Sequence, residues 1–167
     1  MAIIKPNNNT ISAITALPAS IATGKVLQVQ ATQGINIFST TSSSFTDVTG
    51  LALTITPAST SSKILLILNT NMYQSAISAY WGLRWERAIS GGATTNIGNS
   101  TYGLSFARSA IANDFWGGVG MSYLDSPSTT SAVTYQVQVT TTDGTGTAAV
   151  GENSTNQNTI MALEIAG

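Results

Sequence analysis

Acidic side chains are the residues of this chain whose type best suits catalysis or metal binding. The sequence has no histidine and no cysteine, which excludes imidazole and thiol catalysis and zinc sites built from those ligands. The acids are scattered, and no two are adjacent: Asp47, Glu86, Asp114, Asp125, Asp143, Glu152 and Glu164. Distant carboxyl groups can meet in a fold, as in glycosidases, but single acids in turns are usually turn formers. We therefore expect no catalytic residue and no enzymatic activity.

Metal and cofactor sites are not predicted either. The segment "DGTG", followed by Glu152, has some features of a calcium loop but lacks its density of carboxylates. No glycine-rich phosphate loop and no serine nucleophile motif is present. Glu86 lies between Arg84 and Arg87, and the simplest interpretation is a local ion pair or hydrogen-bonded network.

One motif, "NDFWGG", has the residue types of a weak sugar contact. Asp114 precedes Phe115 and Trp116, and an aromatic ring beside an acid can stack on the apolar face of a sugar while the acid binds its hydroxyl groups. The alternative is that these rings belong to a hydrophobic core. Core is the interpretation that we favour for these two rings. We favour it also for Trp81 and Trp85, which share one face of their predicted strand.

Charge is scarce over the whole chain. Charged residues make up 8% of the sequence and the net charge is −1, so no electric field would attract nucleic acid or an anionic membrane. Serine and threonine account for 45 of the 167 residues. Such a surface has little charge repulsion to prevent sheet edges from pairing, so closure or assembly must protect the edges.

The first 23 residues differ from the remainder and form a predicted N-terminal arm, residues 1–23. Pro6, Pro18 and three successive asparagines are typical of loop. The arm does not have the pattern of a convincing signal peptide. It also has no apolar run long enough to span a membrane. Its apolar side chains could lie on a short helix or anchor an irregular segment, and we expect them to pack on a partner protein: Ile3, Ile4, Ile11, Ile14, Leu17 and Ile21.

From residue 24 to 167 the pattern is that of short β-strands separated by turns. Hydrophobic residues alternate with polar ones in "KVLQVQA", "LALTIT" and "AVTYQVQV", and Pro, Ser, Thr and Gly clusters separate the strands. This predicts one all-β domain, an antiparallel β-sandwich or jelly roll. The residues expected inside are Leu27, Val29, Leu53, Ile55, Leu65, Ile67, Trp81, Leu83, Val137 and Leu163.

Three stretches, "GKVLQVQAT", "FSTTSSSFTDVTGLALTITPASTSSKILLIL" and the final "IMALEIAG", resemble a family of bacteriophage virion proteins. These proteins occur in tailed phages of marine bacteria and cyanobacteria and are described as tail fibre or structural proteins. The similarity is densest over Gly24–Leu68 and returns at the C-terminal strand. It implies a β-rich, trimeric, projecting part of the particle, and it carries no catalytic motif.

The resemblance leaves the position on the virion open. A fibre that reaches a receptor normally needs a long shaft, whereas this chain has a short arm and one β-domain. We therefore expect a capsid decoration or cement protein on the virion surface, made in the host cytoplasm and attached to the major capsid protein or another virion protein. The first alternative is a short tail fibre or tail tip that binds host surface glycan, and the second is a glycan-binding module outside any virion. Aromatic side chains left over from the core are candidate trimer contacts: Tyr73, Tyr80 and Phe115.

Overall fold

The computed structural model describes residues 25–35, 37–76, 78–108, 115–141, 146–151 and 157–167. These residues form β-strands joined by turns, and no helix able to cross a membrane occurs among them. The strands are β1 (Val26–Gly34), β2 (Phe38–Thr40), β3 (Thr46–Ile55), β4 (Lys63–Gln74), β5 (Tyr80–Ile89), β6 (Thr94–Ile97), β7 (Ser105–Arg108), β8 (Phe115–Asp125), β9 (Val133–Thr141), β10 (Ala148–Val150) and β11 (Asn158–Ile165).

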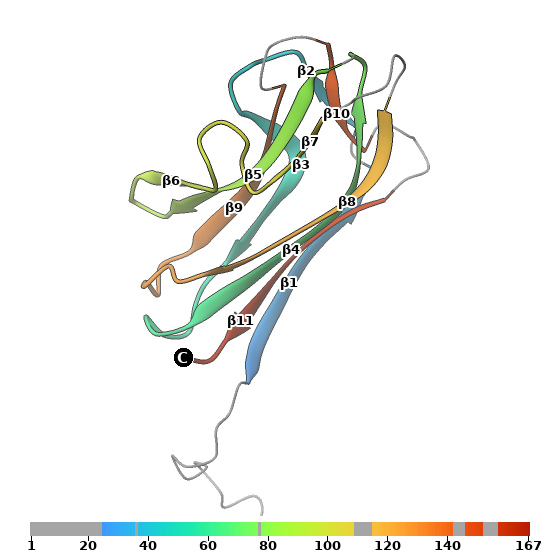
Figure 1. Cartoon of the computed structure of the whole chain (residues 1–167). Helices are drawn as coiled ribbons and strands as arrows, with labels where there is room; N and C mark the ends of the chain where they lie inside the picture. Colours follow the sequence, from blue (N-terminus) through green and yellow to red (C-terminus); the bar gives the residue numbers. More distant parts are fainter. Residues whose placement is uncertain (1–24, 36, 77, 109–114, 142–145, 152–156) are drawn as a thin grey trace, which may run out of the picture.

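The strands build two facing antiparallel sheets (Figure 1). Sheet A has the order β1-β11-β4-β10-β2, with β8 paired to the other side of β4, and sheet B has the order β3-β9-β5-β6, with β7 also paired to β5. The chain alternates between the sheets as it passes through β3, β4 and β5, and it does so again from β8 to β9 and β10. This order of the long strands is that of a jelly roll, so the predicted all-β sandwich is confirmed.

The hydrophobic core lies between the two sheets because each strand turns alternate side chains inward. Sheet B contributes Trp81, Leu83 and Trp85 from β5, and every second residue of β9 from Val133 to Val139 is fully buried. Five of the residues expected inside are confirmed as buried: Leu53, Ile55, Trp81, Leu83 and Val137.

The other five expected core residues are wrong, and all of them lie in sheet A. Leu27 and Val29 on β1 are 40% and 53% exposed. Leu65, Ile67 and Leu163 are half-buried on the outer side of β4 and β11.

The inner side of β4 and β11 carries a different set of residues: Ile64, Leu66, Leu68, Ile160, Ala162 and Glu164. On β1 the inner side is polar and faces β3. Gln28 donates hydrogen bonds to Glu164 (2.6 Å) and to the carbonyl oxygen of Thr56 (2.7 Å), and Thr32 donates to the carbonyl oxygen of Ala52. Because these partners satisfy the polar side chains, the apolar side chains of β1 point outward.

Candidate functional site

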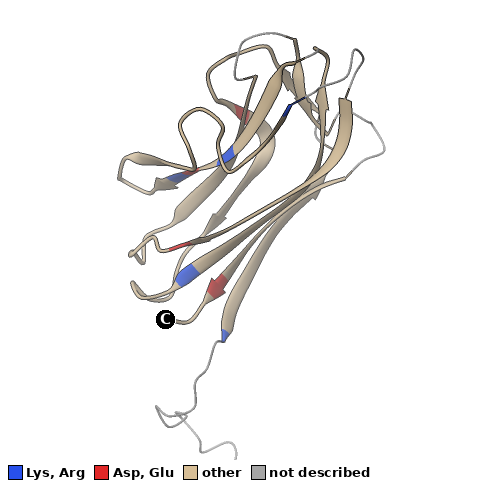
Figure 2. Cartoon of the chain, viewed as in Figure 1, with Lys and Arg blue, Asp and Glu red and all other residues tan. Residues whose placement is uncertain are grey.

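Charged residues are spread thinly over both sheets (Figure 2). Within the described ranges, no three acidic side chains gather in a way that could hold a metal ion, and no enclosed cavity is present. The features that could have a function are therefore one interior charge cluster and the outer faces of the two sheets.

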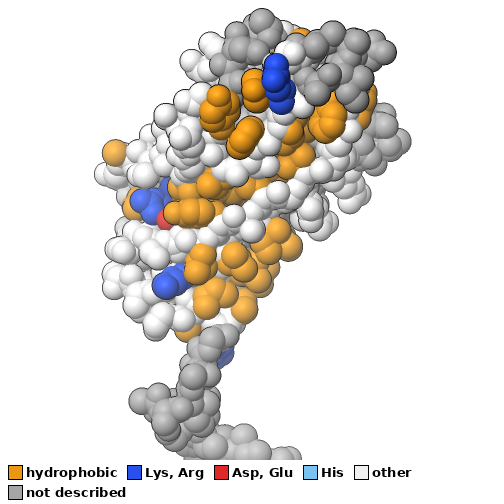
Figure 3. Space-filling model, in the orientation of Figure 1, with side chains coloured by type: hydrophobic (Ala, Val, Ile, Leu, Met, Phe, Trp, Pro, Cys, Tyr) orange, Lys and Arg blue, Asp and Glu red, His pale blue; other side chains and the backbone are white. Residues whose placement is uncertain are grey.

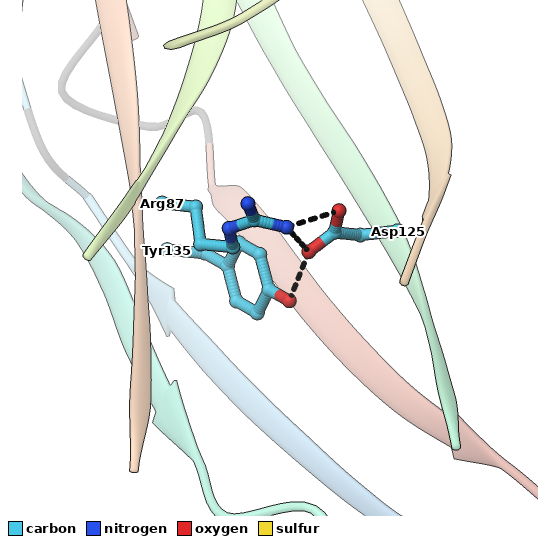
Figure 4. Close-up of polar contacts among 3 residues, drawn as sticks. All are labelled: Arg87, Asp125 and Tyr135. Carbon is cyan, nitrogen blue, oxygen red and sulfur yellow. Dashed lines mark hydrogen bonds and ion pairs between the residues drawn. The ribbon is translucent and has the colours of Figure 1, made fainter. Parts of the chain in front are cut away.

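The interior cluster joins Arg87, Asp125 and Tyr135 (Figure 4). Arg87 lies on β5, Tyr135 lies beside it on β9, and Asp125 ends β8 in the opposite sheet. One guanidinium nitrogen of Arg87 donates to both carboxylate oxygens of Asp125, at 2.8 and 3.0 Å. The hydroxyl of Tyr135 donates to the same carboxylate at 2.7 Å. The local interaction expected around Glu86 includes Arg84, whose pKa burial lowers and the charge of Glu86 raises. Arg87 instead turns inward to Asp125 and ties the two sheets together.

The surroundings of this cluster make it structural. The side chains of Arg87 and Asp125 are 18% and 7% exposed. Burial raises the pKa of Tyr135 far above its usual value, and the hydrogen bond to Asp125 raises it further, so the phenol stays protonated and donates. No cavity brings a substrate to these groups in the described part of the chain.

A second buried carboxylate, Glu164 on β11, fixes the end of sheet A. It accepts hydrogen bonds from the side chain of Gln28 at 2.6 Å and from the backbone N–H of Ala58 at 2.7 Å. Burial raises the pKa of this carboxyl and hydrogen bonds lower it, and the net direction is below the usual value. Glu164 is therefore an ionised structural residue that holds β1 and the turn after β3 against β11.

The outer face of sheet A is apolar at the end where β1 begins. The strand registers place Val29, Leu163, Leu65 and Leu124 in one row across β1, β11, β4 and β8. The ends of the row, Val29 and Leu124, are 53% and 50% exposed. Ala31, Met161 and Ile67 lie in a row next to it. Hydrophobic side chains accordingly cover the surface over β1, β4 and β11 (Figure 3).

The aromatic residues predicted at contacts do not form one site. Tyr73 lies on the outer face of sheet A, where its ring meets that of Trp116 at 4.7 Å between centroids. Phe115 is the neighbour of Trp116 on β8, so its half-buried ring points to the opposite face, next to Gly117. Tyr80 belongs to sheet B. Their roles in trimer or glycan contacts stay predictions.

Sheet B carries an exposed aromatic cluster of its own, made by Tyr80, Tyr102 and Phe106. The ring of Tyr102 lies 5.8 Å from that of Tyr80 and 5.0 Å from that of Phe106, and the guanidinium of Arg108 lies 5.3 Å from the Tyr80 ring. Tyr102 and Phe106 are 39% and 56% exposed. Alternation in "TYGLSFA" predicts that Tyr102 and Phe106 share a face, but nothing in the sequence shows that Tyr80 joins them.

Two glycines hold this cluster in place by letting the loop before β7 lie on β5. A Cβ atom on Gly82 would come within 2.7 Å of the carbonyl oxygen of Tyr102. Gly103 has a φ of 75°, and a Cβ atom there would collide with the backbone of Leu83. Both positions therefore require glycine, and the loop presents Tyr102 beside Tyr80 as a consequence.

A polar network continues along the outer face of sheet B. Arg84 stacks over the ring of Phe45 at 4.0 Å and donates to Gln138 at 2.7 Å, and Gln138 in turn donates to Asp47 at 2.7 Å. Burial lowers the pKa of Arg84, whereas Glu86 and Asp47 raise it, and the guanidinium remains charged at neutral pH. This face thus combines aromatic rings with fixed hydrogen-bonding groups.

The remaining predicted site residues lie outside the described ranges. They are Asp114 and the apolar residues of the arm, Ile3, Ile4, Ile11, Ile14, Leu17 and Ile21. Their roles stay predictions from the sequence.

Comparison with known proteins gives distant structural similarity only. No family model and no curated protein matches the sequence. The chain is similar to the structure of infectious bursal disease virus, Gx strain, with a TM-score of 0.37 and 13% identity over 84% of this chain and 37% of that one. It is also similar to the VP2 subviral particle of the same virus, with a TM-score of 0.35 and 15% identity over 84% and 38%. The chain thus spans little more than a third of these proteins, and we base no functional argument on similarity of this degree.

Proposed function

We propose that this chain is a structural protein of a bacteriophage virion that decorates the capsid as a cement or head-knob protein. The observation that carries the proposal is a jelly-roll domain with an apolar, nearly uncharged outer sheet face, which in water needs a protein partner. The resemblance of Gly24–Leu68 and of the final strand to phage virion proteins supports the same class. In this proposal the domain is a homotrimer on the virion surface.

The N-terminal arm is the proposed attachment to the major capsid protein or another virion protein. Its six apolar anchors carry almost no charge around them. Fully burying one Ile or Leu side chain contributes about 1.5–3 kcal/mol, so six of them can outweigh the entropy lost when part of a flexible segment becomes ordered.

Deletion of Met1–Thr23 tests this attachment. The truncated protein should fold but no longer bind emptied capsids, and heads that lack the protein should lose resistance to heat or osmotic shock. Full occupancy of heads by the truncated protein would exclude the arm as the anchor. Loss of host adsorption with unchanged head stability would instead favour a position on the tail.

A second candidate function, binding of host surface glycan by a tail tip, is favoured by the aromatic cluster of sheet B. Tyr80, Tyr102 and Phe106 offer exposed rings for stacking on sugars, and Arg108 lies beside them with hydrogen-bond donors. Ligand-observed NMR with a panel of methyl glycosides measures such binding. Binding that Phe106→Ala abolishes and Trp116→Ala preserves would support this candidate, and no binding to any glycoside would count against it.

A further inference from the structure

The outer face of sheet A has a second unusual feature besides its apolar row, namely two glycines in the middle of β8. Gly118 and Gly120 occupy positions on the outer side of β8, between Trp116 at one end and Leu124 at the other. A Cβ atom on Gly118 would meet nothing closer than the side-chain oxygen of Asn71 at 3.8 Å, and one on Gly120 would meet that of Asn69 at 3.7 Å. Neither has a positive φ.

The chain's own packing therefore gives no reason for glycine at these two positions. Glycine weakens a strand because it loses more entropy on folding and has no side chain to pack. Where it occurs without an internal cause, a frequent reason is the close approach of another backbone or ligand. The glycines make this part of the face flat, so an external surface can come close to it.

The size and charge of the face fit a second copy of the same chain. Sheet A is four strands wide along β4, either β1-β11-β4-β8 or β2-β10-β4-β8, which is about 19 Å at 4.8 Å per strand. β4 has 12 residues, which span about 40 Å at 3.3 Å each. The resulting area of about 750 Å² agrees with the roughly 800 Å² that each partner buries in a standard interface.

The other possible occupant, the arm, fits less well. One extended segment spans about 5 Å of that width and one helix about 10 Å, so either would leave much of the face open. A copy of the same chain also avoids charge repulsion. Asp125 and Glu164 point inward, and Lys63 at the start of β4 is the charged residue that remains on the outer side of the described parts of β1, β4, β8 and β11. Apolar rows can therefore meet apolar rows.

We propose that copies of this chain associate through the outer faces of sheet A, with the row Val29, Leu163, Leu65 and Leu124 at the centre of the contact and the flat strip of Gly118 and Gly120 beside it. This inference rests on the self-association proposed above and specifies its surface, which in a trimer each chain shares between its two neighbours around the three-fold axis. It is independent of where the oligomer lies on the virion.

The test compares variants of the full chain by sedimentation velocity over a dilution series. Gly118→Thr with Gly120→Thr should weaken association without loss of monomer stability, because a Cβ atom at either position makes no close contact and threonine is the better strand former. Leu124→Asp places a charge in the contact and should raise the dissociation constant by about 30-fold or more. The matched control is Phe106→Asp, at a residue with similar exposure on sheet B, which should associate like the wild type.

Each result decides the inference. The inference is supported if the glycine variant and Leu124→Asp associate more weakly, Phe106→Asp associates like the wild type, and circular dichroism is unchanged. Oligomers that persist in both variants refute the proposed face while leaving self-association intact. A monomeric wild type refutes both proposals. If in that monomer Leu124→Asp makes the arm more susceptible to protease, the arm is the occupant of the face.

Discussion

Removal of the charge at Asp125 should strongly destabilise the protein, and the structure gives the size of the effect. Asp125→Leu leaves the guanidinium of Arg87 without its carboxylate, and the hydroxyl of Tyr135 without its acceptor. Loss of one partner of a buried pair costs about 3–5 kcal/mol. Because the Arg87 side chain is 18% exposed, water can compensate in part, and we expect about 2–4 kcal/mol.

The same reasoning predicts that a second substitution rescues the first. Arg87→Met alone leaves Asp125 buried without a cation and should cost a similar amount. The double variant Arg87→Met with Asp125→Leu removes both charges and replaces them by apolar side chains, which is often neutral in buried pairs. We expect it to be more stable than either single variant, with a coupling of about 1–3 kcal/mol.

Urea unfolding followed by circular dichroism measures these differences. All variants are compared at one protein concentration, because self-association makes apparent stability depend on concentration. For a chain of this size 1 kcal/mol corresponds to about 2–4 °C in melting temperature. Additive losses in the double variant would refute the inference that this pair acts as one tie between the sheets.

Three further predictions concern other parts of the sandwich. Glu164 has a lowered pKa in the folded protein. Its contribution to stability is therefore complete above the unfolded-state pKa of about 4.3 and is lost as the pH falls through the folded-state pKa. Glu164→Gln should lower the urea midpoint at pH 7 and make the midpoint decline less between pH 7 and pH 3. Leu68→Ala should lower the free energy of unfolding by about 2–5 kcal/mol. Leu124→Ala, at a half-exposed position, should lower it by less than about 1 kcal/mol in dissociated protein. Equal losses would show that the inner face of sheet A is misassigned. Gly82→Ala should displace the Tyr102 loop and cost about 1–3 kcal/mol, and an unchanged fluorescence and melting temperature would contradict this.

The fold class was predictable from the sequence because strand alternation and turn residues are local signals. Which side of a strand lies inside is a different question, and β4 and β11 show why it could not be answered. In "KILLIL" both sides are apolar, so alternation alone cannot distinguish Leu65 from Leu66. In "TIMALEI" the side with Glu164 looks like the outside, yet the side chain of Gln28 and the backbone of Ala58, distant in the sequence, make its burial favourable.

The wrong core assignments in sheet A are informative, because all of them are of one kind. Apolar residues were expected inside and lie outside on three neighbouring strands, as at Val29, Leu65 and Leu163. The rule that apolar side chains turn inward applies to a domain that is surrounded by water. The apolar residues on the outer side of sheet A therefore agree with the proposed association through this face. The aromatic cluster of sheet B was only partly predictable, because Tyr80 and Tyr102 meet through the close approach allowed by Gly82.

The position of β4 at the centre of sheet A has a consequence for the way in which the chain folds. Its neighbours are β8 on one side and β11 and β10 on the other, and Leu65 pairs with Leu124 of β8 and with Leu163 of β11. Both partners lie far along the sequence, and such topologies fold slowly. During synthesis β4 emerges from the ribosome long before β11, so a strand that is apolar on both sides must wait unpaired. We expect the nascent chain to be most prone to aggregation in this interval, and to need chaperones more than the finished protein does.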